Sequence, residues 1–159
     1  SQPLLDEAAV LTAMSYVDLN PIRAKLTKSS KQSDYTSAQQ RINQLKQPTK
    51  STIPLMQLST SRHQTHKNSF SFSTQDYLEL TNWAGRIIRN DKRDYIQSDE
   101  PTLLQDLNLN AEGFIELMKK QDDLSQLTVI GSSTVLTHYL VKLENKFIKG
   151  MRLNQRIFG

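Results

Sequence analysis

One short stretch near the start of the chain brings together a phenol, a short amide and two cations, which together could act on a phosphodiester. Tyr16 and Asn20 are four residues apart, so they project from the same face if one helix contains both. Pro21 disfavours helical geometry at Asn20 and suits the first position of a new helix, and Arg23 and Lys25 follow within one turn. The spacing fits a phosphodiester site. It also fits an ordinary corner between two helices, which is the commoner arrangement for residues of these types.

Three motifs in order along the chain resemble one protein family. Residues 16–24, Tyr-Val-Asp-Leu-Asn-Pro-Ile-Arg-Ala, resemble the signature that follows the catalytic core of single-tyrosine HUH transposases, in particular their REP-associated bacterial branch. Residues 33–42 are similar to a motif further along in these proteins, and residues 72–93, which include Trp83, resemble the C-terminal extension of their longer members. The matches cover about residues 11–107.

The resemblance implies roles for two side chains. Tyr16 would attack a DNA phosphodiester and form a 5′-phosphotyrosine link, with Asn20 assisting a metal that polarises the phosphate. The family holds this metal chiefly with a His-hydrophobic-His pair, but His63, His66 and His138 include no two that are two residues apart. We therefore expect a C-terminal piece or a decayed copy of such a transposase. It would be inactive alone, without a cofactor of its own, and a divalent metal such as Mg²⁺ is expected only with the missing core.

The cations of the chain are grouped in sequence. Its net charge is +4, yet residues 19–72 carry +8 and residues 129–159 carry +4, whereas residues 1–18 and 73–128 are acidic. Clustered Lys and Arg can neutralise phosphates and release counterions, although solvated surfaces are often locally basic. The cations predicted to contact DNA are Arg23, Lys25, Lys28, Arg41, Arg86, Arg89, Lys92, Arg93, Arg152 and Arg156.

Composition limits the remaining classes. The chain has 159 residues, of which 36% are hydrophobic, so it is long enough for a core but rich in polar segments. It has no cysteine, which excludes a disulfide framework and thiolate metal sites. It also lacks an apolar run long enough to span a bilayer and a secretory signal pattern. We expect no membrane partner, and a cytoplasmic location is compatible.

Apolar residues recur at helical spacing along most of the chain, which predicts a mainly α fold. We expect an irregular helical bundle with a long polar loop around residues 47–72 and at most short extended segments. In this division, residues 1–46 hold the tyrosine helix and the helices after it, residues 47–72 form a linker, and residues 73–159 form a helical C-terminal domain. The expected helices cover about residues 3–18, 21–26, 33–45, 73–90, 101–107, 111–121 and 132–147.

The helix expected at residues 33–45 has a predicted buried face. Tyr35, Ala38, Ile42 and Leu45 are spaced by three, four and three residues, which favours burial on one side. This pattern leaves Arg41 on the other side with several glutamines. Such a face could hydrogen-bond phosphates or bases, but it is also typical of a solvated helix.

Other features leave alternatives open. Residues 101–121 have the length of a helix-turn-helix, but their acidic character favours a packing role over DNA reading. Trp83 is predicted to lie in the core, and Gly85 to allow close packing of its helix against a neighbour. The tail at residues 148–159 interleaves basic and apolar residues, which suits either a DNA-contacting arm or a terminal element docked on the body. His63 and His66 lie in a segment that does not look helical and has no acidic neighbour, so a metal site there is disfavoured.

Three functional hypotheses follow. The first is the C-terminal, DNA-contacting part of a transposase-like protein, with hairpin or single-stranded DNA as partner and a possible homodimer in the intact protein. The second is a free-standing helical DNA-binding or regulatory protein derived from such a transposase. The third is a protein-interaction scaffold. Salt-dependent binding to hairpin DNA separates the first two hypotheses from the third.

Overall fold

The computed structural model is mainly helical, as the sequence predicts, and its strands are short. It describes residues 3–26, 36–47, 58–59, 70–90, 99–120, 127–144 and 147–158. In chain order the elements are α1 (Glu7–Asp18), α2 (Asn20–Arg23), α3 (Ser37–Lys46), β1 (Leu58–Ser59), β2 (Phe70–Ser73), α4 (Thr74–Asn90), α5 (Thr102–Asp106), α6 (Ala111–Lys119), α8 (Ser133–Lys142) and α9 (Met151–Phe158).

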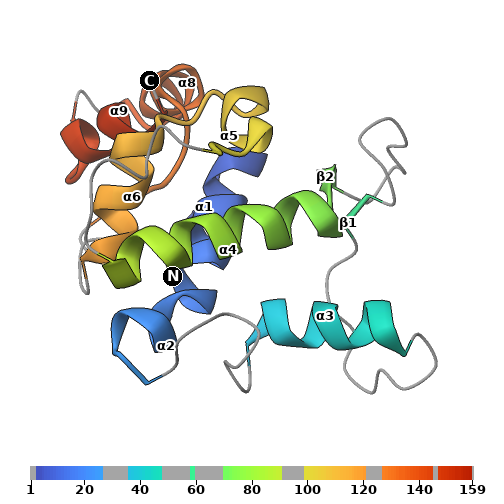
Figure 1. The fold of residues 1–159 in the computed structure, drawn as a ribbon. Helices are drawn as coiled ribbons and strands as arrows, with labels where there is room; N and C mark the ends of the chain where they lie inside the picture. Colours follow the sequence, from blue (N-terminus) through green and yellow to red (C-terminus); the bar gives the residue numbers. More distant parts are fainter. Residues whose placement is uncertain are drawn as a thin grey trace.

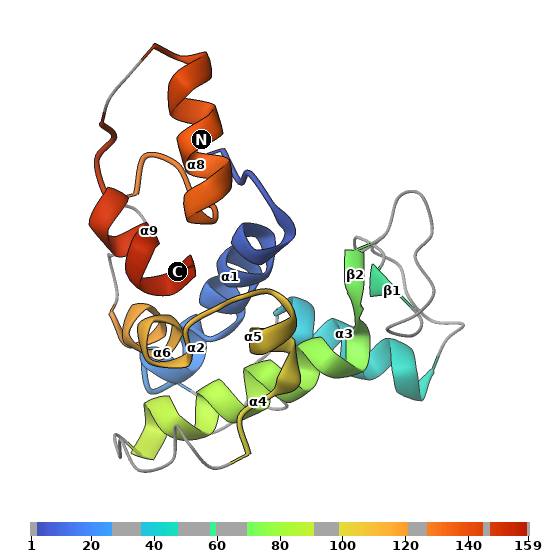
Figure 2. The same ribbon diagram turned by 90° about the horizontal axis from the view of Figure 1, so that it is seen from above.

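Helix α4 is the longest helix of the described chain and runs through the middle of the fold (Figure 1). Helices α1, α2, α3, α5 and α6 all contact it. Its buried stripe includes Tyr77, Leu80, Trp83 and Ile87, so the prediction that Trp83 lies in the core is confirmed. A view from above shows α4 passing beneath α5 while α1 and α6 lie beside it (Figure 2).

The start of α4 is fixed by a capping box. The Ser73 hydroxyl accepts a hydrogen bond from the Asp76 backbone N–H at 3.1 Å, and an Asp76 carboxylate oxygen accepts from the Ser73 N–H at 3.1 Å. This reciprocal pair satisfies backbone donors that the first turn of a helix leaves without partners. The shorter Asp side chain replaces the usual Glu or Gln.

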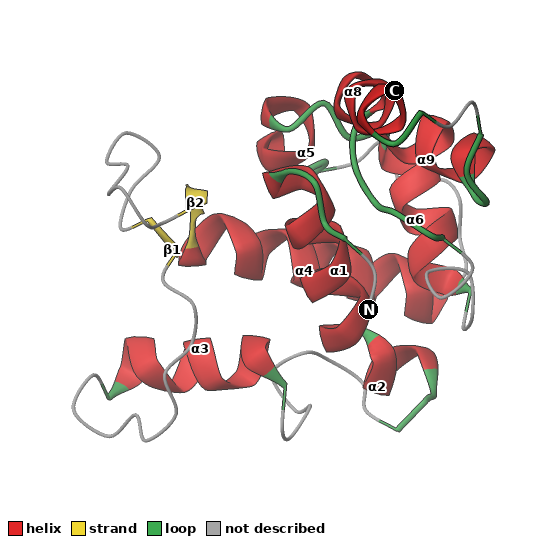
Figure 3. Cartoon of the chain, turned by 180° about the vertical axis from the view of Figure 1, so that it is seen from behind, coloured by secondary structure: helices red, strands yellow, loops and turns green. Residues whose placement is uncertain are grey.

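The two short strands β1 and β2 pair in parallel at one edge of the described fold (Figure 3). Glu7, in the first turn of α1, accepts hydrogen bonds from the Ser71 N–H at 3.1 Å and from the Ser71 hydroxyl, which holds β2 against α1. Leu58 in β1 is buried, as expected for a short extended segment packed on the body. Most of the polar loop predicted around residues 47–72 lies outside the described residues.

The start of the described chain meets the segment that precedes α8. Leu4 forms a parallel bridge with Ile130, and the Asp6 carboxylate caps α1 through the Ala9 N–H at 2.8 Å and accepts from the Ser132 N–H at 2.8 Å. These contacts connect the start of α1 to the start of α8.

One boundary near the C-terminus differs from the prediction. Helix α8 ends at Lys142, before Phe147, which is 81% exposed and therefore contributes nothing to an apolar face. The tail is a docked element, because α9 buries Ile157 and Phe158 against the core. Among the described residues, no helix combines the length and the apolar character needed to cross a bilayer.

One hydrophobic core joins helices from both ends of the sequence. It contains Leu11 and Leu19 from the first part of the chain together with Leu80, Phe114 and Ile157 from the later part. The predicted domain boundaries stay a prediction, but the helices on both sides of the predicted linker bury their apolar faces together.

Candidate functional site

The structure brings Tyr16, Asn20 and Arg23 together at the corner where α1 meets α2. The Arg23 guanidinium carbon lies 4.1 Å from the centre of the Tyr16 ring, within the range of a cation–π contact. One Arg23 Nη also donates to the Asn20 side-chain oxygen at 3.1 Å and to the Tyr16 carbonyl at 3.3 Å. Asn20 is exposed, whereas Tyr16 and Arg23 are half-buried, so Tyr16 is not sealed inside the core.

The last turn of α6 completes this corner. The other Nη of Arg23 donates to the Met118 carbonyl at 2.8 Å, and the Tyr16 hydroxyl donates to the Lys120 carbonyl at 3.2 Å. The last carbonyls of a helix have no partner within the helix, so side chains from elsewhere commonly satisfy them. Residues 101–121 therefore have the packing role that their acidic character favours, and their end also holds the tyrosine in place.

Asp18 is a buried residue of the same motif to which sequence reasoning gave no role. Its carboxylate accepts from the Ser37 N–H at 2.9 Å, the Ala38 N–H at 2.8 Å and the Ser37 hydroxyl at 2.6 Å, and so it caps α3. It also accepts from the Tyr77 hydroxyl of α4 at 2.5 Å. Burial, followed by the charge of Asp18, raises the pKa of Tyr77 above its usual value of 10.0. One carboxylate thus ties three helices together beside the tyrosine corner.

Arg41, predicted to contact DNA, faces the interior instead. It is 4% exposed, and its guanidinium carbon lies 5.9 Å from the centre of the Tyr77 ring, close to the charge of Asp18. Burial lowers the pKa of Arg41, and the neighbouring Tyr77 and Asp18 oppose this shift. The predicted face of α3 is wrong at Arg41 and Leu45, because Leu45 is 63% exposed while Arg41 is buried, although Ala38 is buried as predicted. Its guanidinium is not accessible to a phosphate in this structure.

Gly85 brings α2 and α4 into close contact, as predicted. A Cβ atom added there would lie 2.9 Å from Cδ1 of Ile22 and 3.5 Å from Cδ2 of Leu19, so a larger side chain would displace the corner. The contact places the C-terminal part of α4 beside α2, at the end of the molecule where α6 also ends (Figure 1). Exposed cations at this end, which we call the basic end, are Lys25, Arg86, Arg89 and Lys120.

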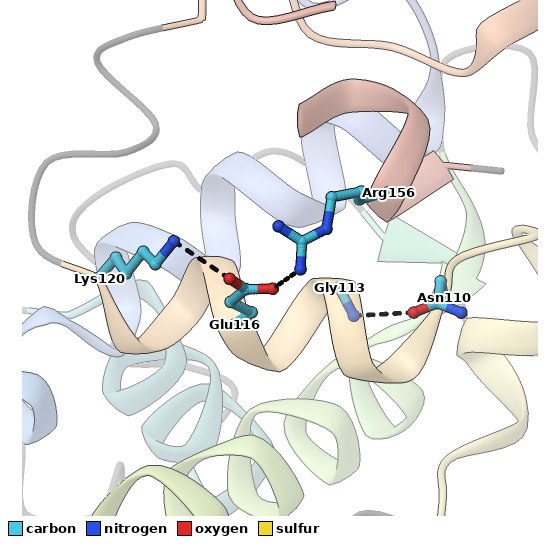
Figure 4. A network of polar contacts seen from close by, with 5 residues as sticks. All are labelled: Asn110, Gly113, Glu116, Lys120 and Arg156. Atoms are coloured by element: carbon cyan, nitrogen blue, oxygen red, sulfur yellow. Dashed lines mark hydrogen bonds and ion pairs between the residues drawn. The ribbon is translucent and has the colours of Figure 1, made fainter. Parts of the chain in front are cut away.

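The cations of α9 lie at the border of this surface. Helix α9 packs on the other side of α6 from α2 (Figure 1). Arg156 forms an ion pair with Glu116, which also pairs with Lys120 at 3.1 Å (Figure 4). Arg152 is exposed on the same helix. Both are exposed, and Arg156 adjoins the basic end through Glu116, the carboxylate that it shares with Lys120.

Several predicted residues lie outside the described part of the chain. Lys28, Lys92, Arg93, His63 and His66 are in this group, so their roles stay predictions. Within the described ranges, no group of three His, Asp or Glu side chains is placed to hold a metal ion. Tyr16 and Asn20 therefore stand in a corner where the described residues gather no such group of ligands.

A groove of about 470 Å³ lies next to the corner, between the exposed side of α1 and the start of α3. Val17, Pro21 and Ser37 contribute to its lining, and Val17 is 65% exposed. Tyr16 does not line it, because the phenol points toward α6 instead. Asn20 of the same corner does line the groove.

No known protein family matches this chain, and comparisons with curated proteins and with solved structures also find no match. The likeness to single-tyrosine transposases stays a prediction from short motifs. What the chain does must therefore be argued from the chemistry of the tyrosine corner and its surroundings.

Proposed function

We propose that this chain is the tyrosine-carrying, DNA-contacting helical part of a transposase-like protein. The observation that carries the proposal is the position of Tyr16 at an accessible corner, next to Asn20 and beside the basic end. Its hydroxyl donates one hydrogen bond to a backbone carbonyl near the surface, at 3.2 Å. A phosphate oxygen could take the place of this carbonyl without unfolding the core. A cytoplasmic location agrees with such a role.

The DNA backbone would lie across the basic end. Lys25 in the turn after α2 and Arg86 and Arg89 on α4 are exposed there, and the two helices pack together through Gly85. Cations that neutralise phosphates release condensed counterions, which produces affinity that does not depend on base sequence and falls with salt. The exposed positions of these side chains leave them able to reach a phosphate chain.

Strand cleavage would need more than this chain. A protonated phenol is a weak nucleophile, and a metal ion that polarises the phosphate is the usual remedy. The resembling family holds that metal with paired histidines, a pattern that the sequence does not contain. In this proposal the chain binds DNA by itself and presents Tyr16 to a metal-binding core carried elsewhere, where Mg²⁺ would be a suitable ion.

Fluorescence anisotropy with a short labelled DNA hairpin tests the binding. We expect the logarithm of the affinity to fall linearly with the logarithm of the salt concentration. Arg86→Ala should weaken binding, whereas Lys142→Ala, which removes an exposed cation at the end of α8, serves as the matched control and should change little. Absence of binding at low salt, or equal losses in both variants, would contradict the proposal.

Tyr16→Phe separates binding from chemistry. It removes the nucleophilic oxygen but keeps the ring on which Arg23 stacks, so hairpin affinity should stay nearly unchanged. In a protein that includes the metal-binding core, the same substitution should abolish strand cleavage. Cleavage that persists in Tyr16→Phe would place the nucleophile at another residue.

A further inference from the structure

Arg23 has the motif position expected of a phosphate contact, but its surroundings indicate another role. We propose that Arg23 is a positioning residue for Tyr16. Arg23 acts through its contact with the last turn of α6 and does not itself contact phosphate. The relevance of Tyr16 to DNA rests on the proposed function, whereas the contacts of Arg23 do not depend on it.

The guanidinium of Arg23 is surrounded by oxygen acceptors and one ring face. Its two Nη atoms donate to the Met118 carbonyl, the Asn20 side chain and the Tyr16 carbonyl at 2.8, 3.1 and 3.3 Å, and its plane stacks on the Tyr16 ring. A planar fork that bonds several acceptors and stacks at the same time is a property of Arg that Lys lacks. Arg23 therefore holds the backbone and the ring of Tyr16 in one arrangement.

A phosphate contact at Arg23 would break this arrangement. The half-buried guanidinium would have to turn away from the Met118 carbonyl or the Tyr16 ring to reach a phosphate outside the corner. Lys25 and Arg86 are exposed, so they can meet a phosphate without such a movement. The DNA contacts of this end should therefore come from the exposed cations.

The last turn of α6 becomes part of the tyrosine corner through the same contacts. The Met118 carbonyl accepts a hydrogen bond from Arg23, which lies 95 positions earlier in the chain. The Lys120 carbonyl accepts one from the Tyr16 hydroxyl, which lies 104 positions earlier. Both acceptors lie where a helix leaves carbonyls without internal partners. The placement of Tyr16 thus depends on a helix that the tyrosine motif does not include.

Nuclear magnetic resonance of the free chain provides the first test. Tyr16 ring signals are assigned by their loss in Tyr16→Phe, and Arg23→Ala should move them toward the positions of a solvent-exposed tyrosine. Arg23→Lys should move them in the same way, because it keeps the charge but lacks the fork. Added methylguanidinium should return the Tyr16 signals of Arg23→Ala to their wild-type positions by binding the carbonyl and amide oxygens that Arg23 contacts in the wild type. Unchanged Tyr16 signals in Arg23→Ala and Arg23→Lys, or no recovery with methylguanidinium, would overturn the proposal.

The salt dependence of hairpin binding provides the second test. Removing a phosphate contact lowers the slope of log affinity against log salt by about one. Arg86→Ala should show this decrease, whereas Arg23→Ala should keep the wild-type slope even if its affinity falls. A slope lowered equally in Arg23→Ala would show a phosphate contact and overturn the proposal. If the wild-type chain binds no hairpin, the proposed function fails, and the resonance experiment still decides the role of Arg23.

Discussion

Two glycines inside helices provide a direct test of the packing described above. Gly113 in α6 and Gly85 in α4 both occupy helix interiors, where replacement by Ala favours the helix by about 1 kcal/mol if nothing else changes. Their surroundings differ. A Cβ atom at Gly113 would lie 2.1 Å from the Arg156 carbonyl oxygen and 2.8 Å from its carbonyl carbon, whereas a Cβ atom at Gly85 would meet the end of the Ile22 side chain at 2.9 Å.

The obstacle at Gly113 is backbone, so it cannot rotate away. An ordinary carbon–oxygen contact is about 3.3 Å or longer, so α9 would have to move by about 1 Å. Movement of α9 would disturb Ile157, which is fully buried and whose carbonyl accepts from the Asn110 N–H at 2.8 Å. Overpacking costs about 1–3 kcal/mol, and a lost hydrogen bond adds about 1 kcal/mol. After subtraction of the helix propensity gain, Gly113→Ala should destabilise the chain by about 1–3 kcal/mol.

The obstacle at Gly85 is a terminal methyl group that can change rotamer. The cost of moving this methyl group should nearly cancel the gain in helix propensity. The free energy of unfolding of Gly85→Ala should therefore lie within about 1 kcal/mol of the wild-type value. Urea unfolding followed by circular dichroism and by the fluorescence of Trp83, the only tryptophan, measures both variants. The corresponding midpoint temperature should fall by about 2–4 °C per kcal/mol in a chain of this size. A Gly113→Ala variant as stable as Gly85→Ala would refute the close approach of α6 and α9.

Substitutions at three further buried polar residues test their contacts, each by urea unfolding. Asp18→Ala leaves the donors of α3 and the Tyr77 hydroxyl without their acceptor, so it should lower the free energy of unfolding by on the order of 3 kcal/mol. Asp18→Asn should lower it by less. Equal stability of Asp18→Ala and wild type would contradict this prediction. Asn154→Ala removes the partner of the Gly131 N–H and the Val129 carbonyl and should cost about 2–4 kcal/mol, so a loss below experimental error would show that water replaces it. The pKa of Tyr77 is raised in the folded state, so Tyr77 contributes its full stabilisation below pH 10. Above that pH the phenol ionises more readily in the unfolded chain, and the free energy of unfolding should fall by about 1.4 kcal/mol per pH unit. This decrease at alkaline pH should be absent in Tyr77→Phe.

Much of the fold could be predicted because the signals are local. The start of α4 follows from Ser73 and Asp76, and its buried stripe follows from the spacing of Tyr77, Leu80 and Trp83, all within three turns. The close approach at Gly85 could be predicted as well, since a glycine inside a helix costs free energy unless a neighbour needs the space. These inferences use only residues that lie near each other in the sequence.

The orientation of α3 could not be predicted in this way. Helical spacing favours Leu45 over Arg41 at a buried position, because a charge is costly to bury without partners. The partners of Arg41 are Tyr77 and Asp18, which come from α4 and α1 and meet only in the folded chain. A buried charge thus reverses the expected face whenever its partners are distant in sequence.

The tyrosine corner shows a stricter limit of sequence reasoning. Tyr16, Asn20 and Arg23 could be predicted as a group, because their side-chain types and spacing carry the information. Their acceptors on α6 are backbone carbonyls of Met118 and Lys120, and any residue at these positions would offer the same oxygen. What determines the contact is where α6 ends and how it docks, so the information lies in the capping and packing of a helix about a hundred residues later. Substitutions that move the end of α6 should therefore change the position of Tyr16 more than conservative changes of the Met118 or Lys120 side chain do.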